Sequence, residues 1–326
     1  MSPSAKSRNP SAIDALGEAV SHMRAKLFPF SFMGWVTLGF VSLLESCGSG
    51  SGSGGMQNKL GNGGSGPLQD PVAMIEAAFG WIAEHMILFV SVLMGLMLIS
   101  LVVMWVRSRT IFVYIDDVAT GRFDLVRPWG EHGSHADSFF VLSLVVQGAS
   151  FILMVLVLGL GGFFVLWARA NEWSGLATGV GLLPILFLFL LALMVAAILG
   201  LVLRDFVAPL QLSRNVSARE ATGVFVSLLG AHPGLLIGYA LLKFVVSIAV
   251  GIVILLGTCL TCCIGAVPLI NQTLFQPIYY AERAWSLKLL AQLGEDVFSK
   301  LGQPPFGGPD DAPTAPIDLS QVEYER

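Results

Sequence analysis

The chain has 326 residues, of which 55% are hydrophobic and 12% are charged, and its formal net charge is −4. Ordinary soluble domains carry about a quarter charged residues. This composition excludes a disordered chain, a nucleic-acid-binding domain and a soluble enzyme of normal make-up. Several apolar blocks are long enough to cross a bilayer as a helix, and they lack the alternation of barrel strands. The predicted fold class is therefore all-α, a polytopic membrane helical bundle.

Residues 1–28 are predicted to be a cytoplasmic N-terminus with an amphipathic helix. Apolar residues recur there at spacings of three and four, which places them on one helical face. A helix of this kind lies in the membrane interface and leads into a span, where it either pads the interface or docks a partner. Two further interfacial helices are predicted, one after Asp70 and Pro71 and one after the capping box of Ser217 and Glu220.

Residues 29–296 are predicted to form a membrane domain of six transmembrane helices. In chain order the apolar blocks cover residues 30–44, 86–106, 139–168, 176–203, 235–260 and 264–281. Residues 48–66 are nearly all Gly, Ser and Asn and are predicted to be a flexible external loop. Residues 297–326, which lack apolar periodicity, are predicted to be a disordered cytoplasmic tail.

The positive charges orient these six blocks. With the N-terminus in the cytoplasm, 15 of the 18 Lys and Arg residues fall on the cytoplasmic side. Lys59 and Arg169 fall outside, and Lys243 lies within the fifth block. Because cytoplasmic loops are enriched in Lys and Arg, the sequence predicts a multi-pass protein of the inner or plasma membrane with both termini in the cytoplasm.

Polar side chains inside the predicted spans form a candidate intramembrane site. The sixth span holds Asn271, Gln272, Thr273 and Gln276, and it is broken by Pro268 and Pro277. These residues either line a path for a substrate or ion, or make hydrogen bonds between helices. Lys243 either extends to the cytoplasmic interface or pairs inside the membrane with a partner such as Glu45 or Gln147.

The four cysteines are predicted to share the external face. Cys47 ends the first span, and Cys259, Cys262 and Cys263 lie between the fifth and sixth. A disulfide among them is a candidate if that side is oxidising, and small buried residues in a tight turn are the alternative. Neighbouring residues bridge with difficulty, so Cys259 is the better local partner for Cys262 or Cys263.

A cytoplasmic loop between the second and third blocks holds several carboxylates together with His132 and His135. Two histidines three residues apart can share a metal ion, but the loop is Gly-rich and the metal signal is weak. The alternative is that Asp116 and Asp117 pair with nearby arginines on a solvated face. No metal site and no cofactor is therefore predicted.

Several motifs resemble an uncharacterised family of six-span bacterial and archaeal membrane proteins, a domain of unknown function with a Gly-rich first external loop. The motifs run through residues 11–296 and include Pro29 to Phe40, Arg122 to Trp129, Asp205 to Pro209, Cys259 to Cys263 and Trp285 to Gly294. The resemblance implies a topology. It implies no activity, and no functional residue is carried over from it.

Three functions fit this sequence. The first is a non-enzymatic membrane protein that organises or assists other membrane components, and it is favoured because no catalytic set is found. The second is a transporter or permease-like protein with a polar path along the sixth span. The third is a membrane enzyme, for which the cytoplasmic loop is the only candidate site. The predicted partners are membrane lipids and other membrane proteins, with no nucleic acid.

Overall fold

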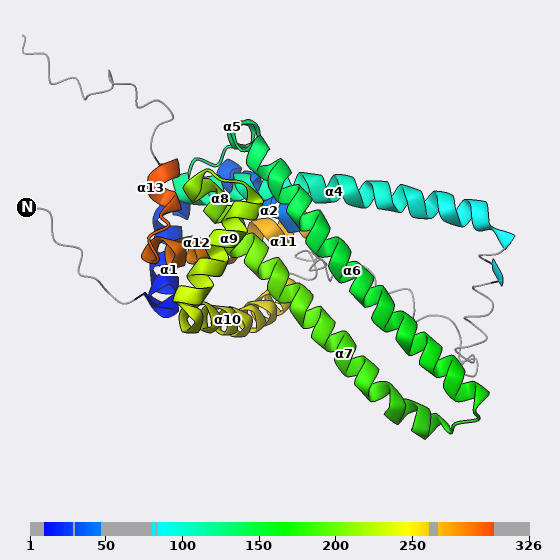
Figure 1. Cartoon of the computed structure of the whole chain (residues 1–326). Coiled ribbons are helices and arrows are strands. Elements are labelled where there is room, and N and C mark those ends of the chain that lie inside the picture. The colour runs from blue at the N-terminus through cyan, green and yellow to red at the C-terminus, as the bar shows by residue number, and fades with distance from the viewer. Residues whose placement is uncertain (1–9, 29, 47–79, 82–83, 261–266, 303–326) are drawn as a thin grey trace, which may run out of the picture.

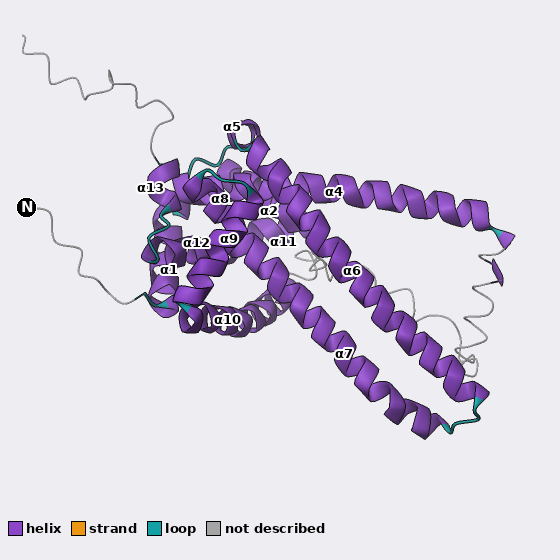
Figure 2. Cartoon of the chain, viewed as in Figure 1, coloured by secondary structure: helices purple, strands orange, loops and turns teal. Residues whose placement is uncertain are grey.

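The computed structural model describes residues 10–28, 30–46, 80–81, 84–260 and 267–302. The secondary structure of these residues is helical and contains no strand (Figure 2), so the all-α prediction is confirmed. The helices are α1 (Ala12–Leu27), α2 (Phe32–Ser46), α4 (Met86–Thr120), α5 (Val126–Glu131), α6 (Gly133–Ala170), α7 (Gly175–Val202), η1 (Leu203–Val207), α8 (Ala208–Arg214), α9 (Ala218–Ala231), α10 (Pro233–Leu260), α11 (Pro268–Leu274), α12 (Gln276–Gln292) and α13 (Val297–Leu301).

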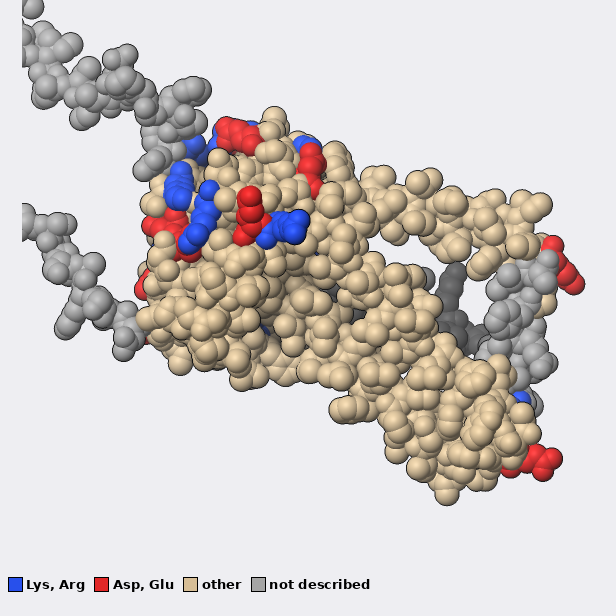
Figure 3. Space-filling view, viewed as in Figure 1, with Lys and Arg blue, Asp and Glu red and all other residues tan. Residues whose placement is uncertain are grey.

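The molecule has two regions of different character (Figure 1). The short helices gather with the inner ends of the long ones into a packed unit, which we call the helical base. From it α4 and the α6–α7 hairpin extend to one side. Charged side chains concentrate on the base and at the far tips, and most of the length between them carries none (Figure 3).

Among the described residues, four helical stretches are long and apolar enough to cross a membrane: α4, α6, the continuous stretch from α7 through α8, and α10. They contain the second to fifth predicted spans. Their apolar side chains are mostly exposed, as expected where lipid is the neighbour. The helix α2 is apolar but has only 15 residues, or about 22 Å at 1.5 Å per residue.

The predicted sixth span is not a single helix in the described structure. Its first residues, 264–266, lie outside the described part of the chain. The remainder divides at Phe275 into α11 and α12, because Pro268 and Pro277 each occupy the first turn of a new helix, where a missing N–H is tolerated. From Tyr280 onward α12 belongs to the core of the base.

The core of the base forms where α1, α12 and the inner half of α4 meet. Ala15 and Ala19 are fully buried, and α1 packs along α12. The indole of Trp285 donates to the Ala12 carbonyl at 2.8 Å, and the Tyr280 hydroxyl donates to the Val118 carbonyl at 3.0 Å. The N-terminal helix is therefore amphipathic as predicted, and much of its inner surface covers α12.

Helix ends follow the sequence closely in two places and differ from the prediction in a third. Ser217 and Glu220 form the predicted capping box, which starts α9. The Ser11 side chain caps α1. The predicted boundary of the tail at residue 297 is too early, because the Asp296 carboxylate caps α13 and Val297 is fully buried in the base.

The α6–α7 hairpin is held together by close approach at its glycines. A side chain at Gly181 would collide with the Phe164 ring, whose nearest atom lies 2.3 Å from the position of an added Cβ. Gly161 is likewise in contact with Ile185. By contrast, the outer half of α4 diverges from this hairpin, and Figure 3 shows a gap between their described atoms.

Candidate functional site

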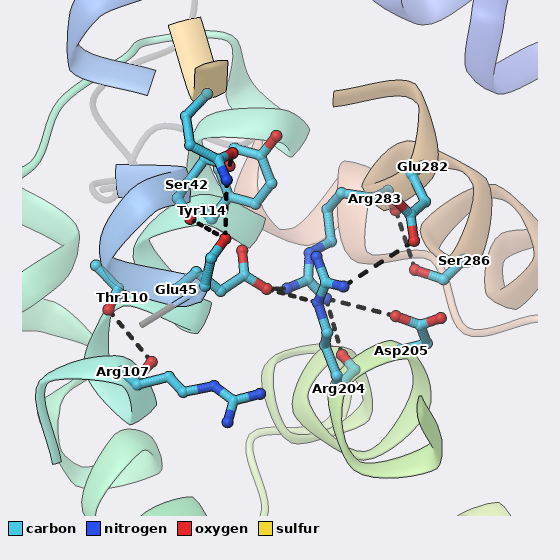
Figure 4. A network of polar contacts seen from close by, with 12 residues as sticks. Ser42, Glu45, Arg107, Thr110, Tyr114, Arg204, Asp205, Glu282, Arg283 and Ser286 are labelled. Carbon is cyan, nitrogen blue, oxygen red and sulfur yellow. Dashed lines mark hydrogen bonds and ion pairs between the residues drawn. The ribbon is translucent and has the colours of Figure 1, made fainter. Parts of the chain in front are cut away.

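Charged side chains from α2, η1 and α12 meet in the interior of the base (Figure 4), and Lys243 of α10 pairs with two of them. We call this set the ionic network: Glu45, Arg204, Asp205, Lys243, Glu282 and Arg283. Three of these residues are acidic and three are basic, so the network has no net charge when all are ionised. Burial of such groups is tolerated only when each has a partner of opposite sign.

Glu45, on the last turn of α2, joins two arginines. Its carboxylate accepts from Arg204 Nε at 2.7 Å and from the Arg283 guanidinium. The Arg283 side chain is fully buried, and it also donates to the Arg204 carbonyl at 2.9 Å. A single carboxylate therefore ties α2 to both η1 and α12.

Asp205 links η1 to α10. Its carboxylate accepts from the Lys243 ammonium and, at 2.9 Å, from the Tyr239 hydroxyl. Tyr239 and Lys243 are one helical turn apart on α10, so both side chains reach the same acid. Lys243 also lies 3.2 Å from a Glu282 oxygen. Both acids are thus neutralised by cations from other elements.

The turn of π-helix at η1 places Arg204 and Asp205 in this network. Pro209 has no N–H to bond the Asp205 carbonyl four residues earlier, so one hydrogen bond of the regular α-helical pattern is missing at this point. The Ala208 N–H instead bonds the Leu203 carbonyl, five residues back. Single π turns of this kind are common at functional sites.

The polar residues predicted in the sixth span bond to neighbouring helices. Gln272 accepts from Ser42 at 2.7 Å and donates to Ser46 at 3.2 Å, which joins α11 to α2. Gln276 donates to the buried Tyr114 hydroxyl of α4 at 3.1 Å. The Tyr279 hydroxyl donates to Asn271 at 3.1 Å.

Thr273 and Lys243 are the remaining residues of the predicted intramembrane site. The Thr273 hydroxyl donates to the Leu269 carbonyl of its own helix, and its side chain covers Gly39 so closely that an added Cβ would lie 2.3 Å from its oxygen. Lys243 does not extend to the interface. It is buried and paired inside the protein, as the second alternative for it requires, but with Asp205 and Glu282 in place of Glu45 or Gln147.

The predicted loop of carboxylates and histidines is mostly helical, because α5 and the start of α6 occupy it. Asp116 is buried and pairs with Arg127 at 2.5 Å, so the expectation of a solvated face is wrong for it. His132 lies 3.4 Å from the same carboxylate, and His135 lies 3.3 Å from the Ser134 hydroxyl. Within the described residues, no three His, Cys, Asp or Glu side chains are grouped closely enough to hold a metal ion.

The candidate disulfide stays a prediction. Cys259 is exposed near the end of α10. Cys47, Cys262 and Cys263 lie outside the described residues, as does the predicted interfacial helix after Asp70.

An apolar cavity of about 240 Å³ adjoins the ionic network between α1, α10 and α12. Leu16, Val20 and Met23, which are spaced three and four apart on α1, line one wall, and Lys243 and Glu282 also line the cavity. The apolar face of α1 therefore borders this cavity in addition to the residues that cover α12.

Sequence reasoning included Lys243 and considered Glu45, but it missed the rest of the network. Arg204 and Arg283 were counted only as positive charges on the cytoplasmic side. The missed signal is that each has an acidic neighbour, Asp205 and Glu282, at the end of an apolar block. An adjacent acid and base at such a position predicts local pairing as well as orientation.

This chain belongs to a family of unknown function, DUF7544, whose model matches residues 10–291. The match confirms the resemblance to an uncharacterised domain and covers the ionic network and the four long apolar stretches. No curated protein and no solved structure gives a significant match to the chain.

Proposed function

We propose that this protein is a non-enzymatic organiser of the membrane, which receives an apolar transmembrane segment of another membrane protein between α4 and the α6–α7 hairpin. The observation that carries the proposal is the divergence of these elements (Figure 1), with apolar side chains exposed along both. Helix packing in lipid depends on close contact between side chains. Two diverging apolar walls offer such contact to a third helix.

The helical base supplies the rigidity that this role needs. The ionic network ties α2, η1, α10 and α12 together, and α4 joins them through Tyr114 and Gln276. The network is balanced in charge and its members are paired. Such an arrangement suits a structural role that holds helices together better than a catalytic role in proton transfer or nucleophilic attack. The outer ends of α4 and the α6–α7 hairpin can therefore remain apart, because the base holds their inner ends in place.

The proposed topology has six passages through the inner or plasma membrane, with both termini in the cytoplasm. The described chain begins and ends in the base, while α4 starts at its far end (Figure 1). This arrangement supports an outward passage in the stretch that contains α2 and a return in the stretch that contains α11. A cysteine at Ser53→Cys should react with a membrane-impermeant thiol reagent in intact cells, and one at Ser320→Cys should not.

Site-specific photo-crosslinking tests the proposed function. A photoreactive residue at Met97 or Leu98, on the exposed outer half of α4, should give a discrete protein adduct in native membranes. The matched control is Val126 of α5, which is 80% exposed on the base and should give no such adduct. Lipid adducts alone at Met97 and Leu98 would contradict the proposal, and an adduct of twice the chain mass would identify a second copy as the partner.

The alternative is a transporter with a polar path along α11 and α12. Its support is that Gln276 Oε1 and Arg283 Nε are buried without a hydrogen-bond partner among the described residues. Buried polar atoms without a partner can bind a water molecule or an ion that moves along the path. Ion or solute flux through liposomes that hold the purified protein, abolished by Gln276→Leu, would favour this alternative over the organiser.

A further inference from the structure

Arg107 of α4 lies beside the ionic network without an acidic partner. Within the described part of the chain, no carboxylate is within ion-pair distance of its guanidinium, and its Nε is buried with no hydrogen bond. In Figure 4 the guanidinium points into the space near Arg204, and only the Arg107 carbonyl is joined to another residue. The six members of the network balance one another, so Arg107 adds one uncompensated positive charge.

A small cavity of about 30 Å³ lies at this point between α4, α6 and α7. Arg107 and Arg204 both line it, together with Ser108, Ser143 and Gln147. Such a volume holds about two water-sized groups, so an oxygen of an anion can enter it. Gln147 and Gly200 at its edge are exposed, so the rest of the anion can lie at its mouth. Two guanidinium groups and nearby polar side chains around one small space form a site for an anion, because each arginine presents N–H groups that match the oxygens of a phosphate.

The position of the cavity along the helices identifies the source of that anion. Arg107 directly follows the uncharged block of α4 that ends at Val106, and Arg204 directly follows the apolar block of α7 and Leu203. Both arginines therefore lie where apolar helix gives way to charged residues, which is the level of the lipid headgroups. Basic pockets between transmembrane helices at this level suit anionic headgroups.

We propose that the cavity lined by Arg107 and Arg204 receives an oxygen of the phosphate group of an anionic phospholipid. The phosphate group lies at the mouth of the cavity, and the acyl chains lie against α4 and the α6–α7 hairpin. The site goes beyond the proposed organiser function and does not depend on it, since it requires only that the spans lie in a bilayer. A free phosphate ion has the same binding chemistry, so the experiment separates the two sources.

Lipid binding to the full-length protein by native mass spectrometry tests the site. Delipidated protein in detergent is titrated with phosphatidylglycerol, with phosphatidylcholine and with inorganic phosphate as separate arms. We expect phosphatidylglycerol to bind more tightly than phosphatidylcholine. Arg107→Gln should weaken phosphatidylglycerol about tenfold, the effect of losing one charge-assisted hydrogen bond. The matched control Arg219→Gln removes an equal charge at an exposed position of α9 and should change the affinity little.

The melting temperature of the delipidated variants separates binding from folding. Arg107 has no internal ion pair, so Arg107→Gln should leave the melting temperature unchanged or slightly higher while it removes the stabilisation that phosphatidylglycerol gives. If inorganic phosphate competes at equal concentration, the site is an anion site and the lipid origin is wrong. Equal phosphatidylglycerol affinity in Arg107→Gln and wild type, or a melting temperature that falls as far as in Glu45→Gln, would overturn the proposal.

Discussion

The two halves of α4 differ in how far their side chains are buried. Ile87, in the outer half, is 86% exposed, whereas Ile115, in the inner half, is fully buried. Both are isoleucines in the same unbroken helix. The outer half carries no charge and is exposed, as suits a helix that crosses a membrane, whereas the inner half contains buried acids and is enclosed by other helices. The two ends of one helix therefore suit different surroundings, the membrane at the outer end and protein at the inner end.

In the inner half of α4, charged side chains are packed against protein and need partners of opposite charge. A buried acid must be paired, and Asp116 meets Arg127 at 2.5 Å. The Trp105 and Trp129 rings flank Arg109, whose guanidinium lies 4.7 Å from the Trp105 ring centre and pairs with Asp137 at 3.1 Å. Buried and paired side chains are thus concentrated in the base, so most of the stability is expected to come from there. Four predictions test this expectation.

The largest effect is expected from Glu45→Gln, which breaks the centre of the ionic network. Removal of one member of a buried ion pair costs about 3–5 kcal/mol. Here two arginines, Arg204 and Arg283, lose their shared carboxylate. Unfolding of the purified protein in a fixed detergent, followed by denaturant or heat, measures the loss.

Two further variants make that result specific to pairing. Glu84→Gln removes an acid from an exposed position near the outer end of α4 and should leave stability unchanged. The double substitution Glu45→Met with Arg283→Met removes the pair together and should recover much of the loss. Equal loss in Glu45→Gln and Glu84→Gln would show that the network does not stabilise the base.

A matched pair of leucine substitutions compares the two regions directly. Leu290→Ala removes a fully buried side chain in α12 and should cost about 2–5 kcal/mol, whereas Leu98→Ala removes one that is 59% exposed and should cost less than about 0.5 kcal/mol. Both are measured by the same unfolding experiment. Similar losses at the two positions would mean that the outer half of α4 is packed against protein in the purified state.

A smaller effect is expected at acidic pH from Glu295 on the base. The hydrogen bond from Arg214 lowers the pKa of the Glu295 carboxyl, and a bond from Ser213 adds to it. Because the folded pKa is lowered, the stability it contributes is present above the ordinary pKa of 4.5 and is lost as the pH falls further. Glu295→Gln should flatten the pH dependence of stability below pH 4.5, and an unchanged slope would exclude this contribution.

The smallest effect is expected from His22 on α1. Burial lowers the pKa of its imidazole, whose Nε2 lies 2.8 Å from the Val118 carbonyl of α4 and therefore carries the proton. Since the neutral form is favoured in the folded protein, this residue lowers stability as the pH falls below 6.5. A His22→Gln variant should lose less stability than the wild type between pH 7 and pH 5.5. The opposite order would mean that the charged imidazole is stabilised.

The sequence predicted the outer parts of the long spans well, because an uninterrupted apolar block has one plausible structure. The capping box at Ser217 was also readable, since its chemistry is local. The contacts within the base could not be predicted in the same way. Glu45, Asp205 and Arg283 lie far apart in the chain, and only the fold brings them together. The break at Phe275 was signalled by Pro277, but hydropathy alone joined the two sides into one span.

The distance between the outer ends of α4 and α7 in lipid tests the central claim most directly. Spin labels at Ile87→Cys and Leu176→Cys report the outer ends, and labels at Val102→Cys and Leu199→Cys report points nearer the base, with the native cysteines replaced. Pulsed electron paramagnetic resonance in nanodiscs should give a clearly longer distance for the outer pair, because the two elements diverge (Figure 1). Equal distances for the two pairs would show that the spans close against each other and leave no place for another helix.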